Sequence, residues 1–286
     1  MSIAGGCDRA VWLAQAAGCA TVQLFTKNNN QWHAPALDFE HIARFRAALD
    51  ETKITEPVAH ASYLINLASP DDVLWNRSID ALVVEVERCH GLGIGDLVVH
   101  PGAHMGSGEE MGLDRVARAL DLALERTRSL RVTIDLETTA GQGTCLGARI
   151  EHLQGALERA QHRDRLGICA DTCHLFAAGY AMDTQAEYDG TISRIAECVG
   201  LDRLRVWHVN DSLRGLGSRV DRHAGIGLGL MGLGPFRHLL NDPRFRDSRL
   251  ILETPKGIVD GEDLDVRNLR ILRDLIEPRS GGRRRG

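Results

Sequence analysis

The chain has 286 residues, of which 43% are apolar, and its formal net charge is −5 with the histidines neutral. This apolar fraction suffices for a sizeable core and argues against disorder, and no apolar run reaches the ~18 residues of a membrane span. A general nucleic-acid coat protein would be basic, so the charge disfavours that class, but it does not exclude a DNA enzyme whose positive charge is local or supplied by metals.

The first ten residues have no charged segment followed by an apolar one, so we expect no signal peptide. The 7 cysteines are scattered and odd in number. This pattern argues against a disulfide framework and favours reduced thiols in a cytoplasmic protein.

Short β-branched runs alternate with longer amphipathic segments. In chain order we predict helix 8–17, strand 20–25, helix 38–52, strand 57–62, helix 72–92, strand 96–100, helix 113–129, strand 131–137, helix 149–161, strand 166–171, helix 184–199, strand 204–210, helix 234–241, strand 249–253 and helix 263–276. Such alternation indicates βαβ units and a parallel sheet.

The predicted fold is α/β, a (β/α)8 TIM barrel that forms a single catalytic domain over residues 1–278. Its first strand is truncated, because only residues 1–3 precede the helix at 8–17. We therefore expect two unpaired strand edges and a translation start upstream of Met1. A doubly wound open sheet is the alternative, although no Gly-x-Gly-x-x-Gly follows the first strand. Residues 279–286 are expected to be a disordered basic tail, with a weak DNA-backbone contact as the alternative.

Polar side chains of one class stand at the carboxyl ends of the predicted strands, where a parallel barrel places its active site. They are His60, His100, Glu137, Asp171, His208 and Glu253, with His174 just after Asp171 and with Asp221 and His223 in the following long loop. Each has an ordinary interpretation as a helix cap, a core histidine or an ion-pair partner. Six successive strands ending in His, Asp or Glu are hard to explain in that way.

Carboxylates that converge in a cavity repel one another, at several kcal/mol each, unless cations neutralise them. Five histidines and four carboxylates make nine side chains, which divide over three ions with one bridging carboxylate. Imidazole-rich ligation without thiolates suits Zn²⁺, with Mn²⁺ or Fe²⁺ as possible substitutes. Cys169 shares the strand face of Asp171, so it either lines the pocket or packs in the core. Three divalent ions would give the site a net charge of about +2, which allows it to hold phosphate.

Eight ordered segments resemble motifs of endonuclease IV, a family of zinc-dependent apurinic/apyrimidinic endonucleases. They are residues 24–32, 60–66, 100–104, 136–143, 171–174, 208–211, 220–223 and 252–254. The resemblance implies a TIM barrel with three zinc ions that acts in DNA repair. It also implies that a metal-activated hydroxide cleaves double-stranded DNA on the 5′ side of an abasic site, which leaves a 3′-hydroxyl and a 5′-deoxyribose phosphate.

The resemblance assigns the ligands to three ions. One ion is held by His60, His100 and Glu137, a second by Glu137, Asp171, His208 and Glu253, and a third by His174, Asp221 and His223. Glu137, Asp171 and Glu253 would be the catalytic carboxylates, with Glu137 as the bridge.

Four loop residues are expected to contact DNA. Tyr63 and Leu64 match family positions that enter the minor groove and help to flip out the abasic nucleotide, although Leu64 has loop packing as an equal alternative. Lys27 and Asn30 lie in the segment 27–32, where Asn30 replaces an arginine that the best-known members insert beside the lesion. We expect a monomer without an obligate protein partner.

Two other functions remain open at this point. A metal-dependent sugar isomerase or epimerase would need one ion, held by Glu137, Asp171, His208 and Glu253, and would leave the remaining ligands without a role. A DNA-damage-binding or purely structural barrel would tolerate the loss of Glu137.

Overall fold

The computed structural model describes residues 1–278, and the tail predicted at 279–286 lies outside them. The first half contains α1 (Cys7–Ala17), β1 (Gln23–Phe25), α2 (Phe39–Thr52), β2 (Val58–His60), α3 (Asp72–Leu92), β3 (Asp96–Val99), α4 (Glu109–Arg126), β4 (Thr133–Glu137) and α5 (Ile150–Arg159). The second half contains η1 (Arg163–Arg165), β5 (Leu166–Asp171), α6 (Thr172–Ala178), α7 (Gln185–Val199), η2 (Leu201–Arg203), β6 (Leu204–His208), β7 (Asp211–Ser212), β8 (His223–Ala224), α8 (Gly234–Asn241), η3 (Pro243–Phe245), β9 (Arg249–Ile251), β10 (Ile258–Val259), β11 (Glu262–Asp263) and α9 (Leu264–Asp274).

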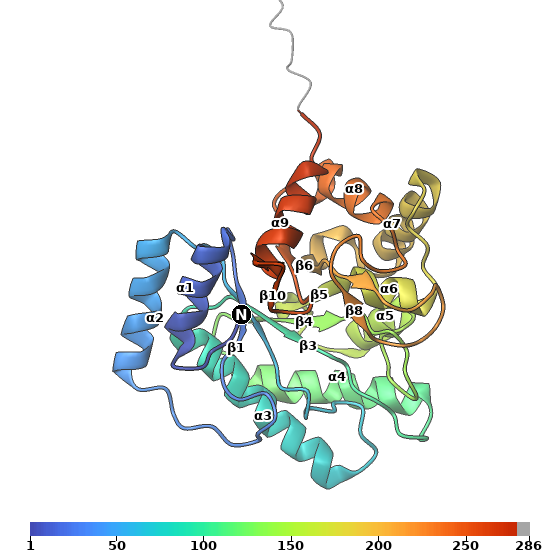
Figure 1. Cartoon of the computed structure of the whole chain (residues 1–286). Helices are drawn as coiled ribbons and strands as arrows, with labels where there is room; N and C mark the ends of the chain where they lie inside the picture. The colour runs from blue at the N-terminus through green and yellow to red at the C-terminus, as the bar shows by residue number, and fades with distance from the viewer. Residues whose placement is uncertain (279–286) are drawn as a thin grey trace, which may run out of the picture.

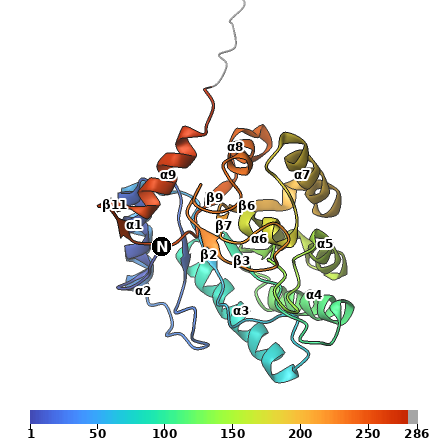
Figure 2. The same ribbon diagram turned by 45° about the vertical axis from the view of Figure 1, so that its right-hand side comes forward.

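Seven strands form one parallel sheet in the order β1-β2-β3-β4-β5-β6-β9. Neighbours in the sheet follow chain order, without the reversal that defines a doubly wound sheet. The helices surround the strands, which meet in the middle of the molecule (Figures 1 and 2). The prediction of a TIM barrel is therefore confirmed, and the doubly wound alternative is wrong. Within residues 1–278, none of the helices combines the length and apolar character that a membrane crossing requires.

The barrel is open between β1 and β9. In this sheet β1 pairs with β2 and β9 pairs with β6, but the two strands do not pair with each other. A cavity of about 360 Å³ lies between them, with Val22, Leu250 and Leu272 among its lining residues. The expectation of two unpaired strand edges is thus confirmed. Residues 1–3 form no strand.

The period of two along each strand explains how the polar residues come together. A small apolar cluster fills the barrel interior, formed by Val58, Val98, Cys169, Val206 and Ile251. Two residues further along the same strands stand His60, His100, Asp171, His208 and Glu253. Side chains at i and i+2 share a face, so the polar side chains form the layer above the apolar one.

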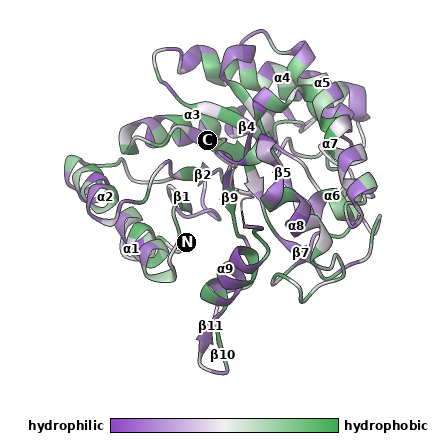
Figure 3. Cartoon of the chain, turned by 90° about the horizontal axis from the view of Figure 1, so that it is seen from above, coloured by the Kyte–Doolittle hydropathy of each residue, from purple (hydrophilic) through white to green (hydrophobic). Residues whose placement is uncertain are grey.

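The larger core lies between the sheet and the helices. It uses the alternate strand residues, such as Leu97, Leu136 and Trp207, which are fully buried. The surrounding helices carry both hydrophilic and hydrophobic residues (Figure 3). Apolar helix faces such as that of α4, with Val116 and Leu120, pack against this core.

The sequence-based prediction missed α6 and the two short hairpins β7–β8 and β10–β11. The helix α6 begins directly after β5, where the Asp171 carboxylate accepts a hydrogen bond from the backbone N–H of His174 at 2.8 Å. It ends at Gly179, whose φ of 105° lies in the left-handed region that glycine favours. Seven residues are too few to show helical periodicity, so only these two caps signalled the helix.

Candidate metal centre

The structure brings together all nine side chains predicted as metal ligands. His60, Glu137, Asp171 and His208 end β2, β4, β5 and β6, His100 and Glu253 follow β3 and β9, His174 lies on α6, Asp221 precedes β8, and His223 begins it. Each has a donor atom within 4 Å of a donor atom of another member. The convergence expected at the carboxyl ends of the strands is confirmed.

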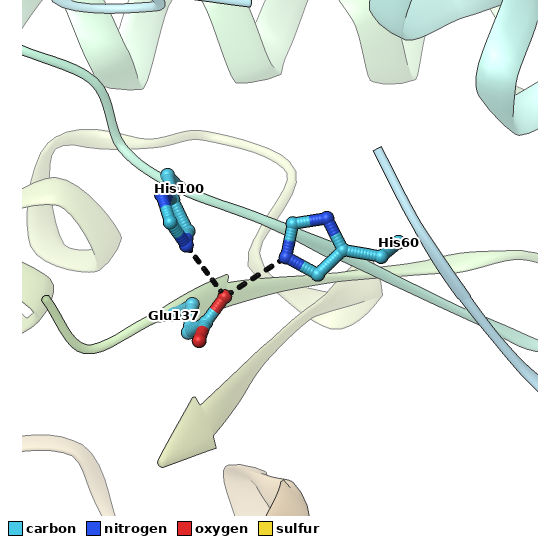
Figure 4. A group of neighbouring side chains, drawn as sticks. All are labelled: His60, His100 and Glu137. Carbon is cyan, nitrogen blue, oxygen red and sulfur yellow. Dashed lines mark hydrogen bonds and ion pairs between the residues drawn. The ribbon is translucent and has the colours of Figure 1, made fainter. Parts of the chain in front are cut away.

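The first set is formed by His60, His100 and Glu137. The Nε2 atoms of His60 and His100 lie 3.1 Å and 2.9 Å from the same oxygen, Oε2 of Glu137. Figure 4 shows both imidazoles pointing at this one atom. Two nitrogens and a carboxylate oxygen that face one point can form most of a tetrahedral coordination shell for a divalent cation.

The second oxygen of Glu137 faces a different histidine. Oε1 lies 2.9 Å from Nδ1 of His208. Nδ1 of His174 lies 3.3 Å from Oε1, but it is closer to the Thr138 carbonyl, at 2.8 Å. Donor atoms of Glu137, Asp171, His208 and Glu253 all lie within 4.8 Å of one another. Glu137 therefore presents its two oxygens to two neighbouring sets of ligands, which is the arrangement of a bridging carboxylate.

A third set surrounds His223. Its Nε2 lies 3.2 Å from Oδ1 of Asp221 and 3.6 Å from Oδ2 of Asp171, and the Nε2 of His174 lies 3.2 Å from Oδ2 of Asp221. Asp171 belongs both to this set and to the one around His208. The turn from Asp171 to His174 thus joins two sets of ligands.

Four of the histidines are held by a hydrogen bond on the ring nitrogen that faces away from the cluster. The outward N–H donates to Ala61 O from His60 (2.7 Å), to Thr138 O from His174 (2.8 Å), to Glu253 O from His223 (3.1 Å) and to Gln23 Oε1 from His208 (2.8 Å). An oxygen of this kind only accepts, so the hydrogen must sit on the outward nitrogen. The inward nitrogen of each ring keeps a lone pair, as metal-binding histidines require.

The charges of the cluster are also those of a metal site. Burial alone would raise the pKa of Glu137, but the imidazoles of His100 and His208 hold it well below its usual range. In the same way His208 lowers the pKa of Glu253 to about 2 against the effect of burial. The charge of Asp171 outweighs burial at His223 and raises its pKa to about 9. Without a cation, protons on the histidines neutralise the carboxylates, and a bound metal would replace those protons.

Two thiols lie beside the cluster: Cys169 with Glu137 and His208, and Cys173 with Asp221 and His223. Burial raises the pKa of the Cys173 thiol to about 12 and that of Cys169 further. Cys169 belongs to the apolar interior layer and also lies beside the cluster, so both of its expected roles fit the structure. The remaining donors are imidazoles and carboxylates, a set that suits Zn²⁺, Mn²⁺ or Fe²⁺.

Two amide side chains support the ligands, and the sequence-based prediction missed both of these roles. The Gln23 amide donates to Oε1 of Glu253 at 2.7 Å. The Asn210 amide donates to Oδ2 of Asp171 at 2.7 Å and accepts from the backbone N–H of Glu253 at 2.8 Å. Gln23 stands alone between the apolar residues Val22 and Leu24, which was a usable signal for the first of these roles.

The residues expected to contact DNA lie in loops beside the cluster. Tyr63 is 55% exposed, and its ring centroid lies 5.3 Å from that of His60 and 6.0 Å from that of His100. These three residues line a cavity of about 200 Å³. Leu64 is half-buried and Asn30 is exposed. The geometry thus leaves Tyr63 and Asn30 free to meet a ligand at the metal centre.

The prediction that Lys27 contacts DNA is wrong, because this side chain is buried. It is 5% exposed, its Nζ lies 3.3 Å from Oε1 of Glu85 on α3, and it donates to the carbonyl of Gln31 at 2.8 Å. The same Glu85 oxygen accepts from the backbone N–H of Ser62 at 3.3 Å. Lys27 therefore holds the loop that carries Asn30 and is not available for a phosphate. A lysine in a polar stretch looks exposed until its buried partner is known.

The chain is similar to known proteins over nearly its whole length. The family model of the xylose isomerase-like TIM barrel matches residues 11–275. A probable endonuclease 4 of Geotalea daltonii is 45% identical over 279 residues, which is 98% of this chain and 97% of that protein. The crystal structure of endonuclease IV from Thermus thermophilus has a TM-score of 0.82 and 36% identity, and the match covers 94% of this chain and 93% of that one. A D-tagatose 3-epimerase-like protein matches with a TM-score of 0.70 and 18% identity over 90% of this chain and 88% of its own, which supports the fold alone.

Proposed function

The chain belongs to the endonuclease IV family, and from this premise we propose that it is a DNA-repair hydrolase that cleaves the phosphodiester on the 5′ side of abasic sites. The products would be a 3′-hydroxyl and a 5′-deoxyribose phosphate. The observation that carries the proposal is the orientation of the histidines: four of them donate their outward N–H and turn the other nitrogen into a cluster of carboxylates.

The proposed cofactor is three zinc ions, for which Mn²⁺ or Fe²⁺ could substitute. The first would be held by His60, His100 and Glu137, the second by Glu137, Asp171, His208 and Glu253, and the third by His174, Asp221 and His223, close to Asp171. When bound, such ions would lower the pKa of water and neutralise charge on a phosphodiester.

The carboxylates have distinct tasks in this proposal. Glu137 links the first two sets, since Oε2 faces His60 and His100 and Oε1 faces His208. Asp171 links the second and third sets and is itself fixed by Asn210. The residues of the three sets would hold divalent ions, which would supply a hydroxide and stabilise negative charge on the phosphate and the leaving oxygen. No separate general acid is then needed.

The DNA substrate would lie over the carboxyl ends of the strands. The exposed ring of Tyr63, already beside His60 and His100, can enter a duplex and stack where a base is missing. Leu64 and Asn30 would contact the neighbouring groove. An abasic nucleotide lacks base pairing and stacking, so it is the easiest one to extrude into the metal centre.

A sugar epimerase is the second candidate, because Glu137, Asp171, His208 and Glu253 also form a complete set for a single ion. That function leaves no task for His60, His100, His174, Asp221 and His223. Backbone carbonyls nevertheless orient His60, His174 and His223 toward the cluster. The additional ligands favour phosphodiester cleavage.

The test is to incubate the purified full chain with an end-labelled duplex that contains one stable abasic analogue. We expect a single cut on the 5′ side of the lesion whose 3′ end a DNA polymerase can extend, loss of the cut after chelation, and recovery with Zn²⁺. The undamaged duplex is the matched control. Turnover of ketoses without any cut in the abasic duplex would favour the epimerase instead.

A further inference from the structure

Gln23 occupies the point where the open edge of the barrel meets the metal centre. It is the first residue of β1, and it lines the cavity that separates β1 from β9. Only 8% of its surface is exposed, although the strands on either side of the cavity share no backbone hydrogen bonds. Its side chain therefore crosses a gap that the sheet leaves open.

The amide of Gln23 makes two hydrogen bonds across this gap. Nε2 donates to Oε1 of Glu253 at 2.7 Å, and Oε1 lies 2.8 Å from Nε2 of His208. An ionised carboxylate only accepts, so the amide nitrogen must face Glu253 and the amide oxygen must face His208. Because that oxygen only accepts, the hydrogen of the imidazole resides on Nε2 of His208.

This arrangement determines which atoms remain for a metal. Nδ1 of His208 keeps its lone pair and lies 2.9 Å from Oε1 of Glu137 and 3.0 Å from Oε2 of Glu253. The other oxygen of Glu253 is occupied by Gln23, so Oε2 is the atom that points into the cluster. One amide thus selects the tautomer of a histidine ligand and the coordinating oxygen of a carboxylate ligand.

We propose that Gln23 is a positioning residue for the metal held by Glu137, Asp171, His208 and Glu253. The proposal rests on the proposed function, since it concerns one of its metal sites. Partners of this kind orient metal ligands, and their loss typically lowers metal affinity by about 10- to 100-fold.

Gln23 differs from the groups that orient the other histidines, because it accepts the hydrogen bond with its side chain. Within residues 1–278, the outward N–H groups of His60, His174 and His223 donate to backbone carbonyls, which no substitution of a side chain removes. His208 instead depends on the side chain of Gln23. Asn210 fixes Asp171 and the backbone of Glu253, so it cannot take over the contact with the Glu253 carboxylate.

The test uses Gln23→Met, which keeps the length of the side chain and removes both hydrogen bonds. Thr21→Val is the control: it also removes a polar group just before β1, where the hydroxyl donates to Glu56 O at 2.9 Å, away from the cluster. Metal-free full-length proteins are titrated with Zn²⁺ against a chromophoric chelator. The visible absorption of the Co²⁺-loaded proteins and their thermal melting are recorded in parallel.

We expect Gln23→Met to bind at least one zinc about 10- to 100-fold more weakly and to change the Co²⁺ spectrum, while Thr21→Val matches the wild type in both. If Gln23→Met does not fold, Gln23→Glu serves instead, since it can accept from His208 but repels Glu253. Binding at wild-type strength or tighter in the folded variant, with an unchanged Co²⁺ spectrum, would overturn the proposal. A wild-type protein that binds three zincs and cuts abasic DNA would then keep the proposed function intact, whereas a wild type that binds none would end both.

Discussion

Replacing Glu137 with glutamine is the most informative single substitution. The side chain is fully buried, and its two oxygens lie between 2.9 Å and 3.3 Å from four imidazole nitrogens. Glutamine keeps the shape and one acceptor oxygen. The other oxygen becomes an NH₂ group. This group can neither accept a hydrogen bond from a protonated imidazole nor coordinate a metal ion.

The expected magnitude follows from this geometry. Removing one partner from a buried charged cluster costs about 3–5 kcal/mol, because the remaining charges are left uncompensated. If this loss is expressed in the transition state, it corresponds to a decrease of about 10²- to 10⁴-fold in the rate of cleavage. The metal content should also fall, since Glu137 serves two of the three proposed sets.

The assay is single-turnover cleavage of the abasic duplex, together with metal analysis of the same preparations. Glu125→Gln is the matched control, because that carboxylate is 54% exposed and pairs with Arg128 at 3.0 Å on the surface. Exposed pairs contribute at most about 1 kcal/mol, so this variant should cleave like the wild type. A Glu137→Gln protein with wild-type cleavage would refute the bridging role and, with it, the reason for assigning adjacent metals.

Three further results are expected. Tyr63→Ala should weaken binding of an abasic duplex by about 1–3 kcal/mol without changing zinc content, as fluorescence titration can measure, and equal loss of zinc would contradict a role in DNA contact. One alanine inserted between Asp171 and His174 should abolish cleavage and release metal, whereas the loss of the helix cap should lower the free energy of unfolding by only about 1 kcal/mol. If the variant with the insertion still cleaves abasic DNA, the spacing of the two residues is unimportant. Zinc affinity should rise with pH by about tenfold per pH unit for each proton released, because only the neutral imidazole binds zinc. The rise should level off near pH 9, the pKa of His223. Chelator competition at several pH values measures this dependence, and an affinity that does not change below pH 8 would contradict it.

The sequence was sufficient to predict the fold and the convergence of the candidate ligands, because both depend on short periods. Alternation of strands and helices predicted the barrel, and a period of two placed His60 above Val58 and His208 above Val206. Their spacing to Asp171 and Asp221 indicated His174 and His223, which lie on elements too short to be recognised by periodicity.

The supporting contacts could not be predicted in the same way. Gln23 and Glu253 are 230 positions apart, and only the curvature of the sheet brings them into contact. Lys27 looked like a DNA-binding lysine because Glu85, its buried partner, lies on a distant helix. A single sequence shows which residue types are available, whereas such pairings depend on which segments the barrel places side by side.

Native mass spectrometry of the freshly purified full chain tests the central claim most directly, because it counts the metal ions that each molecule holds. We predict a mass that corresponds to three zinc ions per chain, lowered to the metal-free mass by chelation together with the loss of cleavage at abasic sites. A chain that carries a single ion and still cleaves abasic DNA, or one that carries none, would contradict the three-metal assignment.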